Sequence, residues 1–149
     1  MTTRPQFAFG RTLAFAERTL TAVLRRHLAE RGTAPETWYA LQLIDLGGPG
    51  LSRGALLGDL EGSRTLNADS ARELLDRLAA EGLIRGEEEI DLTAEGEARY
   101  RGLRDYVTGA ADLFLGQFDA ADVETTVRTL HAITERAAAD LAAAGPAAG

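Results

Sequence analysis

Two neighbouring segments carry most of the evidence for the fold: Leu74-Leu-Asp-Arg-Leu-Ala-Ala-Glu-Gly-Leu-Ile84 and Asp91-Leu-Thr-Ala-Glu-Gly96. In the first segment, apolar residues at helical spacing precede Gly82, and glycine is typical of the position just after a helix ends. A short apolar strand then leads to Gly86, which we expect in the turn of a β-hairpin. The second segment completes the hairpin, and Thr93 is expected to cap a long helix. Together the segments predict a helix, a hairpin and another helix in direct succession.

Further helices are predicted on both sides of these segments. Asn67 is a good N-cap for the helix that carries Leu74, and Ser52 can cap a shorter helix before it. Another helix is expected over residues 37–44, followed by a loop at Gly47-Gly-Pro-Gly50. The chain is therefore predicted to be a single domain, residues 1–149, mainly α-helical with a small β-hairpin.

Long amphipathic helices are predicted near both ends, because apolar residues recur in steps of three and four. The first stripe consists of Phe9, Leu13, Ala16, Leu20, Val23 and His27, and the last of Val123, Val127, Leu130, Thr134, Ala137 and Leu141. These stripes exceed what the central unit, residues 33–96, can cover, and such a stripe needs a partner helix. We expect residues 7–31 and 97–144 to be dimerisation helices of a homodimer. An intramolecular bundle in a monomer stays open as the alternative.

The composition restricts the class of protein. Of the 149 residues, 45% are hydrophobic and 26% charged, which is typical of a folded soluble domain. There is no cysteine, so disulfides and thiolate metal sites are excluded. No apolar run is long enough to span a bilayer and no signal-peptide pattern is present, so we expect a cytoplasmic protein without a membrane partner.

A search for catalytic chemistry gives no candidate. Gly47-Gly-Pro-Gly50 lacks the lysine and the strand–helix context of a phosphate-binding loop. No nucleophile has a partnered base within sequence reach. His131 and Glu135 lie four residues apart on one helix, a pair that is more often a solvated helix contact than a metal site. The sequence therefore predicts no enzyme, no catalytic residue, no cofactor and no metal.

The order of elements resembles the MarR family of winged-helix transcriptional regulators over nearly the whole chain. The segments Leu74–Ile84 and Asp91–Gly96 carry the most specific part of this resemblance. It implies a winged helix-turn-helix core at 33–96, flanked by N- and C-terminal dimerisation helices. It also implies a homodimer that binds double-stranded DNA and is modulated by a small ligand. In such a protein the helix after Asn67 would enter the major groove, and the hairpin would be the wing.

Six residues are the candidates for DNA contact: Arg53, Arg64, Asn67, Ser70, Arg72 and Arg85. The charge of this region argues against DNA binding. The segment 63–96 holds four arginines against nine acidic residues, a net of −5, and the wing tip is Gly86-Glu-Glu-Glu89. Phosphate contacts supply much of the affinity for DNA, and a face of this sign makes few. Two hypotheses therefore stay open: a DNA-binding regulator, or a dimer of the same fold that no longer binds DNA and serves as a ligand-binding or protein-interaction module.

Family members often hold ligands in a cleft between the dimerisation helices and the winged-helix core. The candidate lining residues are Phe15, His27, Trp38 and Tyr39, with Arg11 as an anchor for an anion. Aromatic rings with polar tips suit such a cleft, so an aromatic or anionic ligand is expected. As the alternative, Trp38 and Tyr39 are core or interface aromatics and His27 is a satisfied interface histidine.

Overall fold

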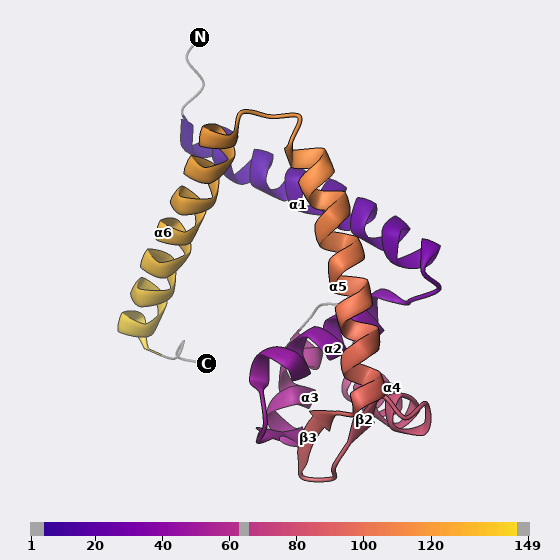
Figure 1. The fold of residues 1–149 in the computed structure, drawn as a ribbon. Coiled ribbons are helices and arrows are strands. Elements are labelled where there is room, and N and C mark those ends of the chain that lie inside the picture. The colour runs from indigo at the N-terminus through magenta and orange to yellow at the C-terminus, as the bar shows by residue number, and fades with distance from the viewer. Residues whose placement is uncertain (1–4, 63–65, 146–149) are drawn as a thin grey trace. The chain divides into compact units, whose positions relative to one another are not determined.

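The computed structural model describes residues 5–62 and 66–145 of the chain, and it is shown in Figure 1. The elements, in chain order, are α1 (Pro5–Glu30), α2 (Pro35–Gly47), β1 (Leu51–Ser52), α3 (Arg53–Gly62), α4 (Ala68–Ala80), β2 (Ile84–Arg85), β3 (Glu89–Leu92), α5 (Ala94–Leu115) and α6 (Ala120–Ala144). Contacts divide the chain into two compact units, residues 1–107 and residues 108–149. No helix in the described ranges is long and apolar enough to cross a membrane.

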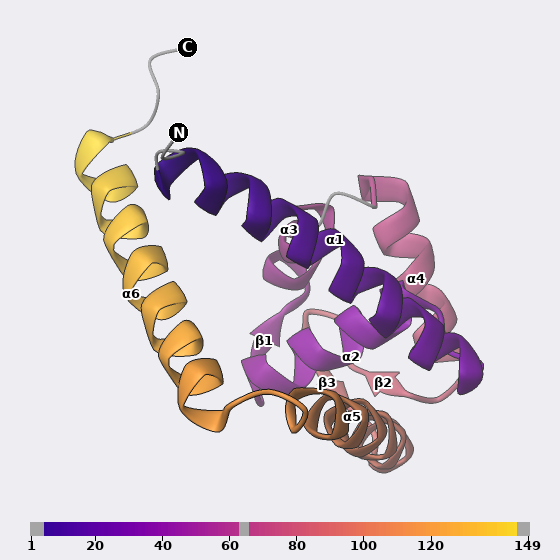
Figure 2. The ribbon, with the colours of Figure 1, turned by 90° about the horizontal axis from the view of Figure 1, so that it is seen from above.

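The first unit holds the hydrophobic core. Helix α3 contacts both α2 and α4, and β3 packs against α2. Figure 2 shows these elements from above. The largest fully buried side chains come from all of these elements and from the end of α1: Leu28, Leu41, Ile44, Leu56, Leu60, Leu74, Leu75, Leu78 and Ile90. Because this core fixes α3, α4 and the hairpin relative to one another, it positions the helix-turn-helix and the wing.

The sheet has one strand more than the sequence analysis expected. Within the described residues the strand order is β1-β3-β2, and both pairings are antiparallel. Strand β1 pairs Leu51 with Ile90, and the N–H of Arg53 donates to the carbonyl oxygen of Glu88 at 2.7 Å. This pairing attaches the start of α3 to the wing.

Glycines allow the close approaches at the hairpin. Gly82, with a φ of +75°, follows the C-cap of α4 as predicted. Gly86 has a φ of +99°, and a Cβ at this position would lie 1.8 Å from the carbonyl oxygen of Glu89. Thr93 caps α5, because its Oγ1 accepts the N–H of Gly96 at 3.0 Å. The predicted fold class, mainly helical with a small β-hairpin, is confirmed.

Much of α1 lies outside the core. Leu28 at its end is fully buried, whereas the predicted apolar stripe is exposed at Phe9, Leu13, Leu20 and Val23. Thus the stripe has the helical spacing that the sequence indicated, but most of it is exposed.

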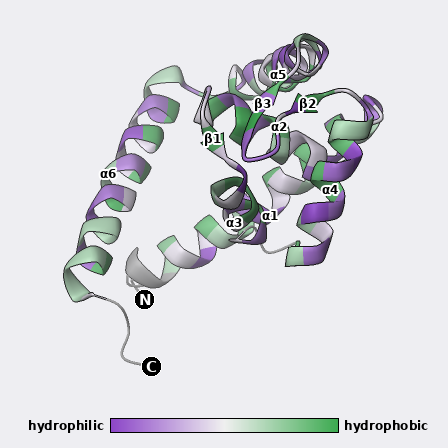
Figure 3. Ribbon diagram, turned by 90° about the horizontal axis from the view of Figure 1, so that it is seen from below, coloured by the Kyte–Doolittle hydropathy of each residue, from purple (hydrophilic) through white to green (hydrophobic). Residues whose placement is uncertain are grey.

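The second unit contains the end of α5 and all of α6. Asp119 caps α6 by accepting the N–H groups of Ala121 and Asp122 at 2.9 and 3.2 Å. No residue of α6 is buried, and Val127, Ile133 and Leu141 are exposed. Figure 3 shows hydrophobic stretches (green) along this helix. Like α1, α6 therefore presents apolar side chains that the described chain leaves uncovered.

Candidate nucleic-acid interface

Helix α4 is the candidate recognition helix, with one face in the core and the other open. Ala71, Leu74, Leu75 and Leu78 are its buried residues. At its start, Oδ1 of Asn67 accepts the N–H of Ser70 at 2.8 Å, as the predicted N-cap requires. Since this cap occupies the oxygen of Asn67, the NH2 group of its amide stays available as a donor.

The exposed face of α4 carries both signs of charge. Asp69, Glu73 and Asp76 are acidic, and Arg72 and Arg77 are basic, and all five are exposed. Much of the α4 ribbon is accordingly purple in Figure 3. Arg72 forms no ion pair with any residue in the described ranges, so its guanidinium is free for a phosphate or a base edge.

The wing is acidic at its tip and paired at its base. Glu87, Glu88 and Glu89 are all exposed. In β2, Nη2 of Arg85 lies 3.4 Å from Oδ2 of Asp91, its pairing partner in β3. The one arginine of the wing is therefore already next to a carboxylate.

Arg53 is paired in a similar way. Its Nη2 lies 3.5 Å from Oδ1 of Asp76, so the side chain reaches from the first residue of α3 to the exposed face of α4. The predicted DNA-contacting residues thus fall into two groups. Asn67, Ser70 and Arg72 gather at the start of α4, whereas Arg53 and Arg85 are each held by an aspartate. Arg64 lies outside the described residues.

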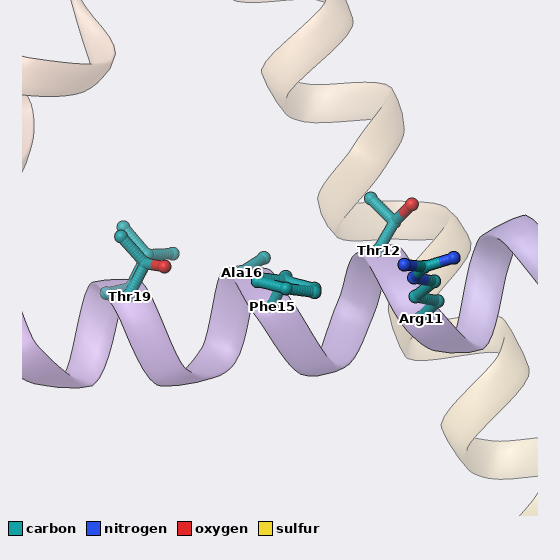
Figure 4. Close-up of a pocket in the computed structure, with 6 residues that line it drawn as sticks. Arg11, Thr12, Phe15, Ala16 and Thr19 are labelled. Carbon is teal, nitrogen blue, oxygen red and sulfur yellow. The ribbon is translucent and has the colours of Figure 1, made fainter.

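The predicted ligand-binding residues occupy three places in the first unit. Arg11 and Phe15 line an open hollow on the surface of α1, together with Thr12, Ala16, Thr19 and Leu20 (Figure 4). Phe15 is 56% exposed, and the guanidinium of Arg18 lies 4.8 Å from the centre of its ring. Because all six lining residues belong to one helix, the hollow is an open surface rather than an enclosed cavity.

His27 belongs to a polar cluster between α1 and α5. Its ring meets the ring of Tyr106 edge-on at 6.0 Å, and its Nδ1 lies 3.6 Å from Oε2 of Glu30. This Nδ1 is buried and has no hydrogen-bond partner in the part of the chain described. The hydroxyl of Tyr106 donates to Oε2 of Glu30, and the guanidinium of Arg31 lies 4.2 Å from the Tyr106 ring centre. The sequence indicated only His27 of this cluster.

The hydrogen bond between Tyr106 and Glu30 affects both groups. It is the largest cause that lowers the pKa of Glu30, with smaller contributions from His27 and Arg26. The same bond is the largest cause that raises the pKa of Tyr106 above its ordinary value. The cluster therefore holds an ionised carboxylate against a protonated phenol.

The third place is the core itself. Trp38 is 5% exposed and stacks on Tyr100, with 5.5 Å between ring centres, and Tyr39 is partly buried against the core. Trp38 has the environment of a core aromatic. The first unit therefore does not bring the five predicted ligand residues into one cavity.

Solved structures resemble this chain over most of its length. A MarR family protein from Bacillus stearothermophilus is 20% identical, with 93% of this chain and 99% of that chain covered and a TM-score of 0.73. A MarR family protein from Mycobacterium tuberculosis, solved in a complex with DNA, is 20% identical, with 83% and 95% covered and a TM-score of 0.69. A structure described as a MarR family transcription regulator is 20% identical, with 93% of each chain covered and a TM-score of 0.71.

No protein-family model matches the sequence, and no curated protein matches it significantly. The likeness is thus one of structure, at identities that show the fold. This chain has the winged-helix fold of the MarR family proteins.

Proposed function

We propose that this protein is a MarR-like transcriptional regulator that binds double-stranded DNA through α4. The observation that carries the proposal is the open face of α4, where Asn67, Ser70 and Arg72 gather at the helix start, and Arg72 has no ion-pair partner among the described residues. A helix that enters the major groove uses donors in its first turns to contact base edges and phosphates. The structural likeness to a MarR family protein in a complex with DNA supports this assignment.

The regulator acts as a homodimer in this proposal. Apolar side chains of α1 and α6 are exposed, and burial against a second copy would remove them from water. A twofold axis relates the two α4 helices, so the operator is pseudo-palindromic with half-sites about one duplex turn apart. Such a regulator acts in the cytoplasm, where it meets the chromosome.

A small aromatic or anionic ligand modulates the dimer. Arg11 and Phe15, exposed four residues apart on α1, offer a cation and an aromatic face for it, and His27 offers a further polar group nearer the core. The ligand would favour a spacing of the two α4 helices that does not fit DNA, which shifts the population away from the bound form.

A second candidate function rests on a specific observation. Arg53 and Arg85 are paired with aspartates, and three glutamates form the wing tip. On this basis the protein is a dimer of the same fold that binds a small molecule or another protein but not DNA. It then shows no DNA affinity at any salt concentration, while an aromatic or anionic compound binds saturably.

The test is a fluorescence-anisotropy titration with the DNA upstream of the protein's own gene, at low salt and then at increasing salt. We expect binding that weakens steeply with salt. Arg72→Ala should weaken it roughly tenfold, within the range for loss of one base or phosphate contact. The matched control is Arg99→Ala, which removes from α5 an exposed arginine that pairs with no carboxylate in the described part of the chain and should have little effect. If the wild-type protein does not bind even at low salt, the regulator proposal is abandoned in favour of the second candidate.

A further inference from the structure

Two of the cations nearest the proposed DNA-binding face are held by carboxylates of the same chain. Arg53 lies 3.5 Å from Asp76, and Arg85 lies 3.4 Å from Asp91. Each pair joins different elements, α3 to α4 and β2 to β3. Arg72, between them in sequence, has no such partner among the described residues.

The position of Arg53 makes its ion pair relevant to both the wing and α4. Its backbone N–H donates to Glu88 in the wing loop, and its side chain reaches Asp76 on α4. Arg53 therefore lies between the two elements that would contact a duplex. The Arg53 side chain is 33% exposed and that of Asp76 77%, so solvent, or a phosphate, has access to the pair.

We propose that Asp76 and Asp91 compete with DNA phosphates for Arg53 and Arg85, and so weaken DNA binding from within the chain. This inference rests on the proposed function. An arginine that is already neutralised releases few counterions when it meets a phosphate, because it must first exchange one anion for another. Exposed ion pairs are weak, so the exchange is reversible and lowers affinity without preventing binding.

The alternative explanation is general repulsion by acidic residues, and the chain offers a control for it. Glu73 lies three residues before Asp76 in α4, is exposed, and pairs with no arginine in the described ranges. Asp76→Ala and Glu73→Ala thus remove the same charge from the same helix and replace it with the same helix-forming residue. Only Asp76→Ala also releases an arginine.

The experiment measures DNA affinity against salt for the wild type, Asp76→Ala and Glu73→Ala, with the same upstream DNA. We expect Asp76→Ala to bind roughly tenfold more tightly than Glu73→Ala, since both protomers of a dimer gain a free arginine. The slope of log affinity against log salt should steepen by about 0.9 per added phosphate contact for Asp76→Ala alone. In the background of Arg53→Ala, the advantage of Asp76→Ala should disappear.

Asp91→Asn tests the second pair independently, through Arg85, and keeps an oxygen that can accept the N–H of Leu92 as Asp91 now does. Two results would overturn the proposed competition: equal gains in DNA affinity for Asp76→Ala and Glu73→Ala, or a gain that persists in the Arg53→Ala background. Neither result would contradict the proposed regulator, whose DNA binding depends on Arg72. If none of these proteins binds DNA at low salt, this inference and the proposed function fail together.

Discussion

Among single side chains, Glu30 and Tyr106 join α1 to α5 over a sequence separation of 76 residues. The pKa of Glu30 is lowered, so its contribution to stability is present above the ordinary glutamate value of about 4.3 and is lost as pH falls through the lowered pKa. The pKa of Tyr106 is raised, so its contribution is present below about pH 10 and is lost as pH rises through the raised pKa. The bond therefore stabilises the first unit between roughly pH 5 and pH 10.

We expect Tyr106→Phe to raise the pKa of Glu30 toward its ordinary value, because the phenol supplies the largest cause of the lowering. The phenylalanine ring can keep the contacts with His27 and Arg31. The measurement is the carboxyl carbon chemical shift of Glu30 against pH. Tyr39→Phe, which removes a hydroxyl that does not contribute to the lowering of the Glu30 pKa, is the control and should leave Glu30 unchanged. An unaltered Glu30 pKa in Tyr106→Phe would assign the lowering to His27 and Arg26 instead.

At the scale of elements, the start of α5 packs tightly against the chain leading into β2. Gly96 is buried, and a Cβ there would lie 1.9 Å from the carbonyl oxygen of Leu83. Gly96→Ala should therefore destabilise the fold by about 1–3 kcal/mol, the usual cost of overpacking. Gly102→Ala, in the same helix with no heavy atom within 4 Å, should instead stabilise it by about 0.5–1 kcal/mol. The free energy of unfolding, measured in urea, distinguishes these outcomes. Equal effects of the two substitutions would contradict this packing.

The elements with strong local signals were predictable from the sequence. Asn67 caps α4, Gly82 follows the end of α4, and Thr93 caps α5, because each of these roles depends on the residue and its near neighbours. Strand β1 was missed, since it is two residues long and exists only through its pairing with β3. Periodicity cannot reveal an element of that length.

The candidate site was less predictable because, like β1, it depends on contacts between residues that are not neighbours in the sequence. The sequence identified Arg53 and Arg85 as cations, but Arg53 pairs with a residue 23 positions away and Arg85 with one across a hairpin. Trp38 is of a residue type that suits a ligand-binding cleft. Only the packing of α2 against the other elements places it on Tyr100 in the core. Local pattern therefore identified the residue types, and tertiary structure determined which of them are free.

At the scale of the whole molecule, the net charge of −7 opposes the approach of any polyanion. The proposed DNA binding therefore depends on a few well-placed cations and on the two α4 helices of a dimer acting together. A single copy presents one α4, so the second copy matters more here than in a basic protein. The assembly state is thus a test of the function as well as of the architecture.

We expect a particle of twice the 15.9 kDa chain mass in solution. Leu20 is 52% exposed on the apolar stripe of α1, and Leu20→Glu would bury an unpaired charge in each half of the interface. The dissociation constant should rise at least roughly a hundredfold, since about 1.4 kcal/mol corresponds to tenfold and each copy carries the change. Ala22→Glu adds the same charge two residues on, which turns it to the opposite side of α1, and should leave the dimer intact. Sedimentation velocity over a range of concentrations distinguishes these outcomes. A wild-type protein that stays monomeric at every concentration would present one α4 per particle, which is too few for the proposed operator.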